Sequence, residues 1–210
     1  MHGRDLSPAF FLANKGYDVW ISNNRGTKYS REHKTLDPEK KDFWSFSFVD
    51  LYKDDKANIK YIEEQTGYTK IAYIGHSQGT SQMFAGMAMD SDWLDKHVSV
   101  FLAVAPVARL ENCKSFLLST IASANYAVVA LAKTLGLYEL FSANYLTRTA
   151  MKTICGTFPT LCKSVSVLFA DQNPFHDDSF YFGSYMTHNP SGTSLDALTH
   201  FAQVMTSKKF

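Results

Sequence analysis

The feature that most constrains the fold of this chain is a glycine–serine turn at residues 75–79, Gly-His-Ser-Gln-Gly. A short apolar run that favours β structure, Lys-Ile-Ala-Tyr-Ile, leads into the turn at residues 70–74, and a helix-favouring stretch occupies residues 78–89. A chain that passes from strand to helix in so few residues must turn sharply, and the two glycines give its backbone room to do so. The pattern therefore predicts a strand–turn–helix unit with Ser77 at its apex.

Two further apolar runs, at residues 17–22 and 98–105, are typical of buried strands. Between the first run and the turn, apolar positions recur at helical spacing over residues 43–64, and Gly67 lies where that helix should end. The order strand, helix, strand, helix, strand implies a parallel sheet with crossover helices on its faces. We therefore expect an α/β fold.

The hydrophobic pattern of the sequence changes after residue 109. Long apolar stretches without a strand pattern over residues 110–164 predict a helical insertion, and interruptions at Asn125, Lys133 and Gly136 keep residues 116–141 below the ~20 apolar residues of a membrane span. We expect three parts: a core segment at residues 1–109, a helical cap or lid region at residues 110–190, and a helix that returns to the core at residues 191–210.

The amino-acid composition excludes some classes of function. The 210 residues, 45% of them hydrophobic, suffice for one sizeable core, and 21 basic against 20 acidic residues give no indication of a nucleic-acid partner. No secretory signal is recognisable, so the sequence as written would remain in the cytosol. Three cysteines lack metal-ligand spacing; Cys155 and Cys162 are close enough for one bridge, and Cys113 is expected to be a free thiol. We expect neither metal nor cofactor.

The turn also carries the candidate chemistry. A G-x-S-x-G turn between strand and helix holds its serine in a strained conformation with Oγ clear of the sheet, which predicts that Ser77 is a nucleophile and that Gly75 and Gly79 are required sterically. The N–H of Gln78, at the opening of the helix, is placed to hydrogen-bond the oxyanion formed on attack at an ester carbonyl. His76 is expected to support the turn rather than to act as the base.

Five blocks of sequence extend this pattern in one fixed order. They are residues 16–20 with 24–26, residues 43–48, residues 75–80, residues 105–108 and residues 188–194. Together they resemble the acid lipase family of the α/β-hydrolase fold, which includes gastric and lysosomal acid lipases and fungal sterol esterases, over nearly the whole chain.

This resemblance implies hydrolysis of lipid esters, such as acylglycerols or sterol esters, with Ser77 as nucleophile and Gln78 as oxyanion donor. It also implies that residues 110–190 shelter an acyl chain and face a membrane or lipid-droplet surface, that Cys155 and Cys162 pair, and that the protein is secreted or lysosomal. The oligomeric state stays open.

This sequence departs from the family's pattern in two places. The family's upstream His-Gly loop is not matched by His2-Gly3, which lies too close to Tyr17 for the strand and helix that should intervene. The triad acid and histidine should follow later strands, so we expect a fragment truncated at both ends whose sheet exposes apolar edges. We interpret the remaining acids and histidines that satisfy the chain order as loop and packing residues: Asp171, His176, Asp177, Asp178, His188, Asp196 and His200.

Two other functions stay open. The chain could be a lipid-binding or regulatory protein without catalysis, in which case lipid binding should survive Ser77→Ala. It could also be another serine hydrolase, such as a soluble esterase or a thioesterase, which should prefer short water-soluble substrates. The large apolar cap region argues against the latter.

Overall fold

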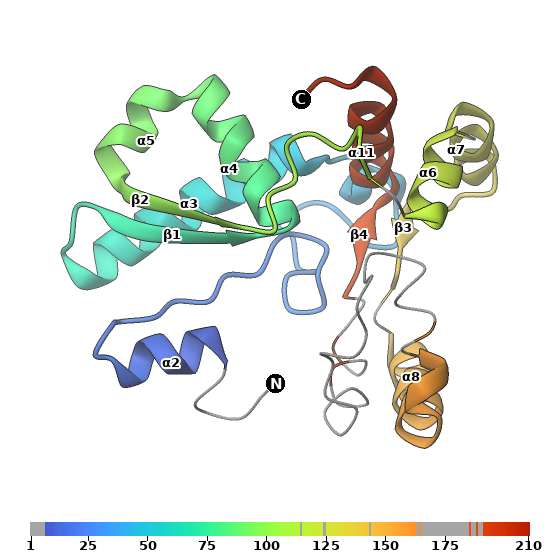
Figure 1. Ribbon diagram of the computed structural model, residues 1–210, viewed down its shortest axis with the longest axis horizontal. Helices are drawn as coiled ribbons and strands as arrows, with labels where there is room; N and C mark the ends of the chain where they lie inside the picture. Colours follow the sequence, from blue (N-terminus) through green and yellow to red (C-terminus); the bar gives the residue numbers. More distant parts are fainter. Residues whose placement is uncertain are drawn as a thin grey trace.

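The computed structural model describes residues 7–113, 115–123, 125–142, 144–162, 164, 185, 188 and 191–210. The first half of the chain forms α2 (Pro8–Asn14), η1 (Lys41–Trp44), α3 (Phe48–Thr66), β1 (Ile71–His76), α4 (Gln78–Met89), α5 (Ser91–His97) and β2 (Val98–Val104). They are followed by α6 (Phe116–Ser123), α7 (Asn125–Thr134), β3 (Glu139–Leu140), α8 (Tyr145–Thr157), β4 (Thr193–Ser194) and α11 (Leu195–Ser207) (Figure 1).

The centre of the fold is a parallel pair of strands. β1 and β2 run in register from Ala72 opposite Val100 to His76 opposite Val104, with α4 and α5 forming the crossover between them. α3 packs against α4 so closely that a Cβ on Gly86 would lie 2.3 Å from the ring of Tyr52 (Figure 1). This strand–helix–strand unit confirms the predicted α/β architecture.

The two faces of this sheet differ in burial. On the helix side Tyr73 and Phe101 pack with their ring centroids 5.8 Å apart. On the opposite side Ile74, Leu102 and Val104 remain about half exposed. One face of the sheet therefore exposes apolar side chains, whereas the sequence predicted exposed apolar edges.

The sequence encodes both ends of α3. The Ser47 side chain accepts a hydrogen bond from the N–H of Val49, and the Asp50 carboxylate accepts one from the N–H of Ser47 at 3.0 Å, which forms a capping box. Gly67 ends the helix in the left-handed region, at φ +77°. The predicted end is confirmed, but the helix begins at Phe48 rather than at Phe43, because the cap at Ser47 separates it from η1.

The predicted strand at residues 17–22 is wrong. This segment has no regular secondary structure, and Tyr17, Trp20 and Ile21 are exposed. Residues 18–22 form no backbone–backbone hydrogen bond with any other described residue. A strand requires a neighbour that satisfies its N–H and C=O groups, and that neighbour cannot be read from the composition of the segment itself.

Beyond residue 110 the described chain is mostly helical, as predicted, except that β3 pairs with β4 in an antiparallel ladder. A strand of two residues is too short to leave an alternating pattern, which is why the sequence did not indicate it. Within the described ranges, no helix has both the length and the apolar character needed to cross a membrane.

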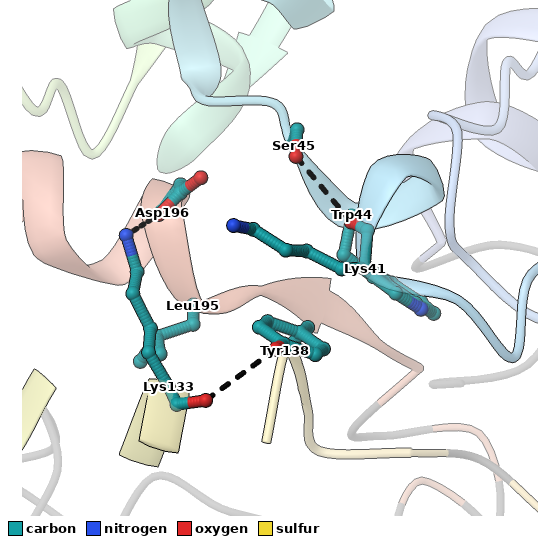
Figure 2. A pocket seen from close by; sticks show the side chains of 7 residues that line it. All are labelled: Lys41, Trp44, Ser45, Lys133, Tyr138, Leu195 and Asp196. Atoms are coloured by element: carbon teal, nitrogen blue, oxygen red, sulfur yellow. Dashed lines mark hydrogen bonds and ion pairs between the residues drawn. The ribbon is translucent and has the colours of Figure 1, made fainter. Parts of the chain in front are cut away.

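The helix α11 joins this second region to the core. Its Val204 packs against Phe48 and Ala85, and its Asp196 forms an ion pair with Lys133 of α7 at 2.9 Å. Figure 2 shows this pair beside a small pocket that is also lined by residues of η1. The ion pair therefore fixes α7 to α11, and the apolar contact fixes α11 to the core.

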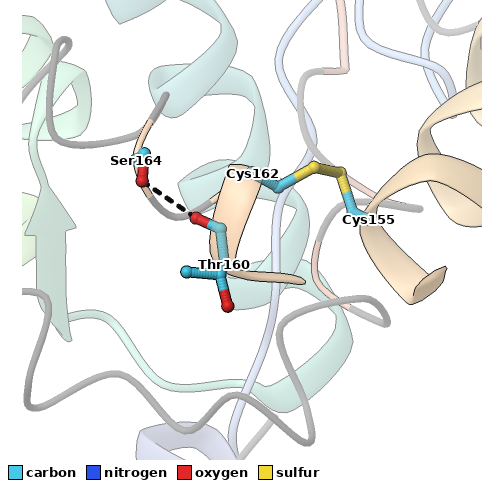
Figure 3. Close-up of a disulfide and its surroundings, with 4 residues drawn as sticks. All are labelled: Cys155, Thr160, Cys162 and Ser164. Atoms are coloured by element: carbon cyan, nitrogen blue, oxygen red, sulfur yellow. Dashed lines mark hydrogen bonds between the residues drawn. A yellow bond between two sulfur atoms is a disulfide. The ribbon is translucent and has the colours of Figure 1, made fainter. Parts of the chain in front are cut away.

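The disulfide implied by the resemblance is present in the structure. Cys155 of α8 is bonded to Cys162, with their Cα atoms 5.5 Å apart (Figure 3). Both half-cystines are buried, and Met151 packs against them. Cys113 is a free thiol, as predicted.

Candidate active site

Ser77 stands at the junction of β1 and α4 with φ +53° and ψ −117°. Positive φ is unfavourable for a residue with a side chain and persists only where neighbouring structure enforces it. Here the Ser77 N–H donates to the carbonyl of Val104 at 3.0 Å, and its carbonyl accepts from the N–H and the hydroxyl of Thr80 at 2.9 and 2.6 Å. The Ser77 side chain is exposed at the apex of the turn.

Two buried hydroxyls anchor the turn to the segment after β2. The Thr80 hydroxyl accepts from the N–H of Val107 at 2.8 Å, and the Ser81 hydroxyl donates to the carbonyl of Val107 at 2.6 Å. Both side chains have no exposed surface. These bonds fix the first turn of α4 against the sheet and so maintain the strained serine.

The glycine requirement holds at one of the two expected positions. A Cβ on Gly75 would lie 2.8 Å from the carbonyl oxygen of Gly79, so any side chain there would collide with the helix backbone. A Cβ on Gly79 would meet only the Tyr73 hydroxyl, at 3.8 Å, which is ordinary contact. The predicted steric demand at Gly79 is therefore wrong, because the backbone of this residue, and not the direction of its missing side chain, faces Gly75.

The neighbours of Ser77 in sequence have different positions. Gln78 is half-buried and is the first residue of α4, where backbone N–H groups have no partner within the helix. His76 is exposed at the end of β1. Of the two, only Gln78 lines the same pocket as Ser77.

That pocket is open and has a volume of about 480 Å³. Its wall comes from segments far apart in the chain: Asn24, Arg25, Thr27, Phe46, Leu51, Ser77, Gln78, Phe141, Ser191, Gly192 and Thr193. Three of the blocks that resemble the acid lipases, at residues 24–26, 43–48 and 188–194, contribute to this wall, although the sequence alone did not place them at the site. The resemblance of these blocks was the one sequence feature that could have indicated the pocket wall.

Two glycines bring the distant walls together. Gly192, at φ +94°, lies so close to the loop at residues 24–27 that a Cβ on it would be 2.7 Å from the carbonyl oxygen of Gly26. The N–H of Lys28 donates to the carbonyl of Ser191 at 3.1 Å. Close approach of two backbones beside Ser77 thus forms one side of the pocket.

Substituting Gly192 with alanine should separate these walls. We expect a loss of about 1–3 kcal/mol of stability from the collision with Gly26, in addition to the cost of positive φ. Gly16→Ala is the matched control, because Gly16 has φ +90° and nothing within 4 Å of the added Cβ. Urea unfolding of both variants separates the two costs, and equal losses would show that the contact contributes nothing.

One charged residue lines the pocket, and its charge is matched. Arg25 donates from Nε to both carboxylate oxygens of Asp54, at 2.9 and 3.1 Å, and its backbone N–H also donates to Asp54. This hydrogen bonding raises the pKa of the Arg25 guanidinium above its ordinary value. The pair fastens the loop of the pocket wall to α3.

None of the described candidate acids and bases lines this pocket. His200 stacks on Phe48, with centroids 4.1 Å apart, and burial lowers its pKa. Asp196 pairs with Lys133, and His188 is exposed in a turn. The remaining candidates, Asp171, His176, Asp177 and Asp178, lie outside the described residues, as does the rejected His2-Gly3 pair. The described ranges also hold no group of three or more side chains suited to a metal ion.

A strained serine between a parallel strand and a helix, exposed to a pocket, is the arrangement of α/β hydrolases. Residues 5–131 match the family described as alpha/beta hydrolase fold, and the chain belongs to that family. The predicted fold is confirmed.

Several named proteins are similar to this chain over almost its whole length. The chain is 33% identical to lipase lipl-5 of Caenorhabditis elegans over 96% of its own length and 51% of that protein. It is 34% identical to gastric triacylglycerol lipase of Rattus norvegicus and 32% identical to lysosomal acid lipase/cholesteryl ester hydrolase of Macaca fascicularis, in both cases over 97% of this chain and 51% of the relative. The resemblance to acid lipases is confirmed, and the chain spans about half the length of these relatives.

Proposed function

We propose that this chain is the nucleophile-bearing part of a lipase that hydrolyses carboxylic esters of lipids, such as acylglycerols or sterol esters. The observation that carries the proposal is the conformation of Ser77, at φ +53° with its side chain exposed to a pocket of about 480 Å³. Relatives that are named as lipases support the substrate class.

The proposed reaction has two steps. Ser77 Oγ attacks the ester carbonyl carbon, its proton passes to a base, and the alcohol leaves from a tetrahedral intermediate to give an acyl-enzyme. Water then attacks the acyl carbon to give a second tetrahedral intermediate, which breaks its bond to Ser77 Oγ, releases the fatty acid and returns the proton to Ser77. The N–H of Gln78 donates to the oxyanion of both intermediates, a contact that in other hydrolases accounts for about 10²–10³ in rate. Neither step needs a metal or cofactor.

Covalent labelling tests the role of Ser77. We expect a fluorophosphonate at high concentration to form an adduct on Ser77, located by peptide mass spectrometry, with only slow turnover of long-chain p-nitrophenyl esters. None of the histidines in the described ranges lines the pocket of Ser77, and a serine without an aligned imidazole is a weak nucleophile. Ser77→Ala should abolish the adduct, whereas Ser45→Ala, at another exposed serine, should not. A folded chain that is labelled elsewhere, or not at all, contradicts the proposal.

A second candidate is lipid binding without turnover. The described pocket wall combines Phe46, Leu51 and Phe141 with uncharged polar groups, and the charge of Arg25 is matched by Asp54. Such a wall suits a long-chain ester whether or not it is cleaved. Binding of a fluorescent long-chain ester that survives Ser77→Ala, with no adduct on Ser77 in the unaltered chain, would favour this candidate. Preference for short soluble esters or thioesters would instead indicate a different hydrolase.

We also propose that the cap region contacts a lipid surface and that the protein is secreted or lysosomal. Exposed apolar side chains are frequent on and beside α7 and α8: Leu131, Leu135, Tyr145, Leu146, Phe158 and Leu161 are each more than half exposed. The disulfide between Cys155 and Cys162 supports an oxidising compartment.

A further inference from the structure

The hydroxyl of Tyr73 connects the two sides of the turn that holds Ser77. Tyr73 lies in β1, before the turn, and its hydroxyl donates to the carbonyl of Gly79, after the turn, at 3.4 Å. The peptide unit with this carbonyl also contains the N–H of Thr80, which donates to the carbonyl of Ser77 at 2.9 Å. A change in the Tyr73 contact therefore acts on a peptide group that is itself hydrogen-bonded to the backbone of Ser77.

A buried carboxyl group from α3 lies behind this contact. Asp55 is 2% exposed, and its carboxyl interacts electrostatically with the Tyr73 hydroxyl. Its Oδ2 atom has no hydrogen-bond partner among the described residues. A buried carboxylate with an unpartnered oxygen is costly, which favours the neutral form of Asp55.

Tyr73 has one proton to donate, and two acceptors compete for it. An ionised Asp55 is the stronger acceptor and draws the hydroxyl proton away from the carbonyl of Gly79. A protonated Asp55 donates to the Tyr73 oxygen instead and leaves the hydroxyl proton to Gly79. The distance of 3.4 Å to Gly79 exceeds the 2.5–3.0 Å that is usual for O–H···O bonds, so this contact has room to tighten or release.

Few other charges face Asp55. Its neighbours on α3 are Asp54, whose negative charge is matched by Arg25, and the hydroxyl of Tyr52, and β1 contributes Tyr73. The helix packed against α3, α4, contains no ionisable side chain, and neither does β2. Burial, together with the charge of Asp54, raises the pKa of Asp55 to about 7, while the Tyr73 hydroxyl opposes the shift.

We propose that Asp55 and Tyr73 are positioning residues for Ser77. When Asp55 is protonated, the Tyr73 hydroxyl donates its hydrogen bond to the carbonyl of Gly79, and when Asp55 is ionised, the hydroxyl donates to Asp55 instead. The turn is then best ordered when Asp55 carries a proton. The effect on catalysis rests on the proposed function, whereas the exchange of hydrogen bonds does not.

The exchange is measured without turnover by following the ¹⁵N–¹H amide signal of Thr80 from about pH 5 to about pH 9. We expect the signal to shift with a midpoint near the pKa of Asp55, at about 7. The shift should be absent in Asp55→Asn, which is permanently neutral, and in Tyr73→Phe, which lacks the hydroxyl. Asp95→Asn, at an exposed position of α5, is the control and should leave it unchanged. A signal that does not titrate, or that titrates in Asp55→Asn, overturns the proposal.

The second readout is the fluorophosphonate labelling rate of Ser77. The ratio of the rate in the unaltered chain to that in Asp55→Asn should be near unity below the midpoint and fall severalfold above it. Tyr73→Phe should label slowly at every pH. If Thr80 titrates as expected but no variant is labelled, the proposed function fails and the exchange stands. Labelling with a constant ratio overturns the positioning role.

Discussion

Replacing Met83 with alanine is expected to lower the free energy of unfolding by about 2–5 kcal/mol. The Met83 side chain is 1% exposed and packs with Tyr52 of α3 and Leu94 of α5 in the cluster beneath the sheet. Truncation removes buried methylene and thioether groups and leaves a cavity where three elements meet. Urea unfolding monitored by far-ultraviolet circular dichroism measures the loss.

The control lies one turn further along the same helix. Met87 is 51% exposed, so Met87→Ala removes the same atoms from the opposite environment and should change stability by no more than about 0.5 kcal/mol. Because helix propensity changes equally in both variants, the difference between them reports burial alone. Comparable losses at the two positions would contradict the packing of α4 against α3 and α5.

The core of this chain was predictable because its signals are local. The helix predicted at residues 78–89 is α4 with the same bounds, and Gly75 was correctly required, since the close approach of strand and helix is determined within five residues of Ser77. The strand predicted at residues 17–22 failed for the opposite reason. Its composition favours β structure, but a ladder depends on a partner elsewhere in the chain.

The pocket illustrates the same limit. Ser77 and Gln78 follow from the turn pattern, whereas the facing wall at residues 191–193 depends on a backbone contact with Gly26, more than 160 residues away in sequence. No periodicity carries information over that separation, and only the resemblance of whole blocks suggested that these residues matter.

Asp55 is different, because a sequence signal for its burial existed. It lies four residues after Leu51 and four before Ile59, both 1% exposed, and so falls on the apolar face of α3. A carboxylate at an apolar helical position indicates an unusual environment. The flanking charges of Asp54 and Lys56 hid this signal within a polar stretch.

The burial of Asp55 should make the stability of the fold fall as pH rises. Its pKa is raised to about 7, mainly by burial, from about 3.9 for an unperturbed aspartate. Between these values the unfolded chain has lost the proton that the folded chain retains, so the folded state binds more protons and unfolding becomes easier with increasing pH. At about 1.4 kcal/mol per pKa unit, the fall amounts to about 4 kcal/mol between pH ~4 and pH ~7, with no further loss above the folded pKa.

Other groups titrate in the same window, so the prediction concerns a difference between variants. Asp55→Asn lacks the ionisation, and the stability of the unaltered chain minus that of this variant should decline over the window and then level off. Asp95→Asn, at an exposed site, should follow the unaltered chain at every pH. The measurement is urea unfolding at intervals of pH. A difference that stays flat or rises would mean that Asp55 ionises in the folded state without penalty, in which case water or a partner reaches its Oδ2 atom and the competition for the Tyr73 proton loses its physical cause.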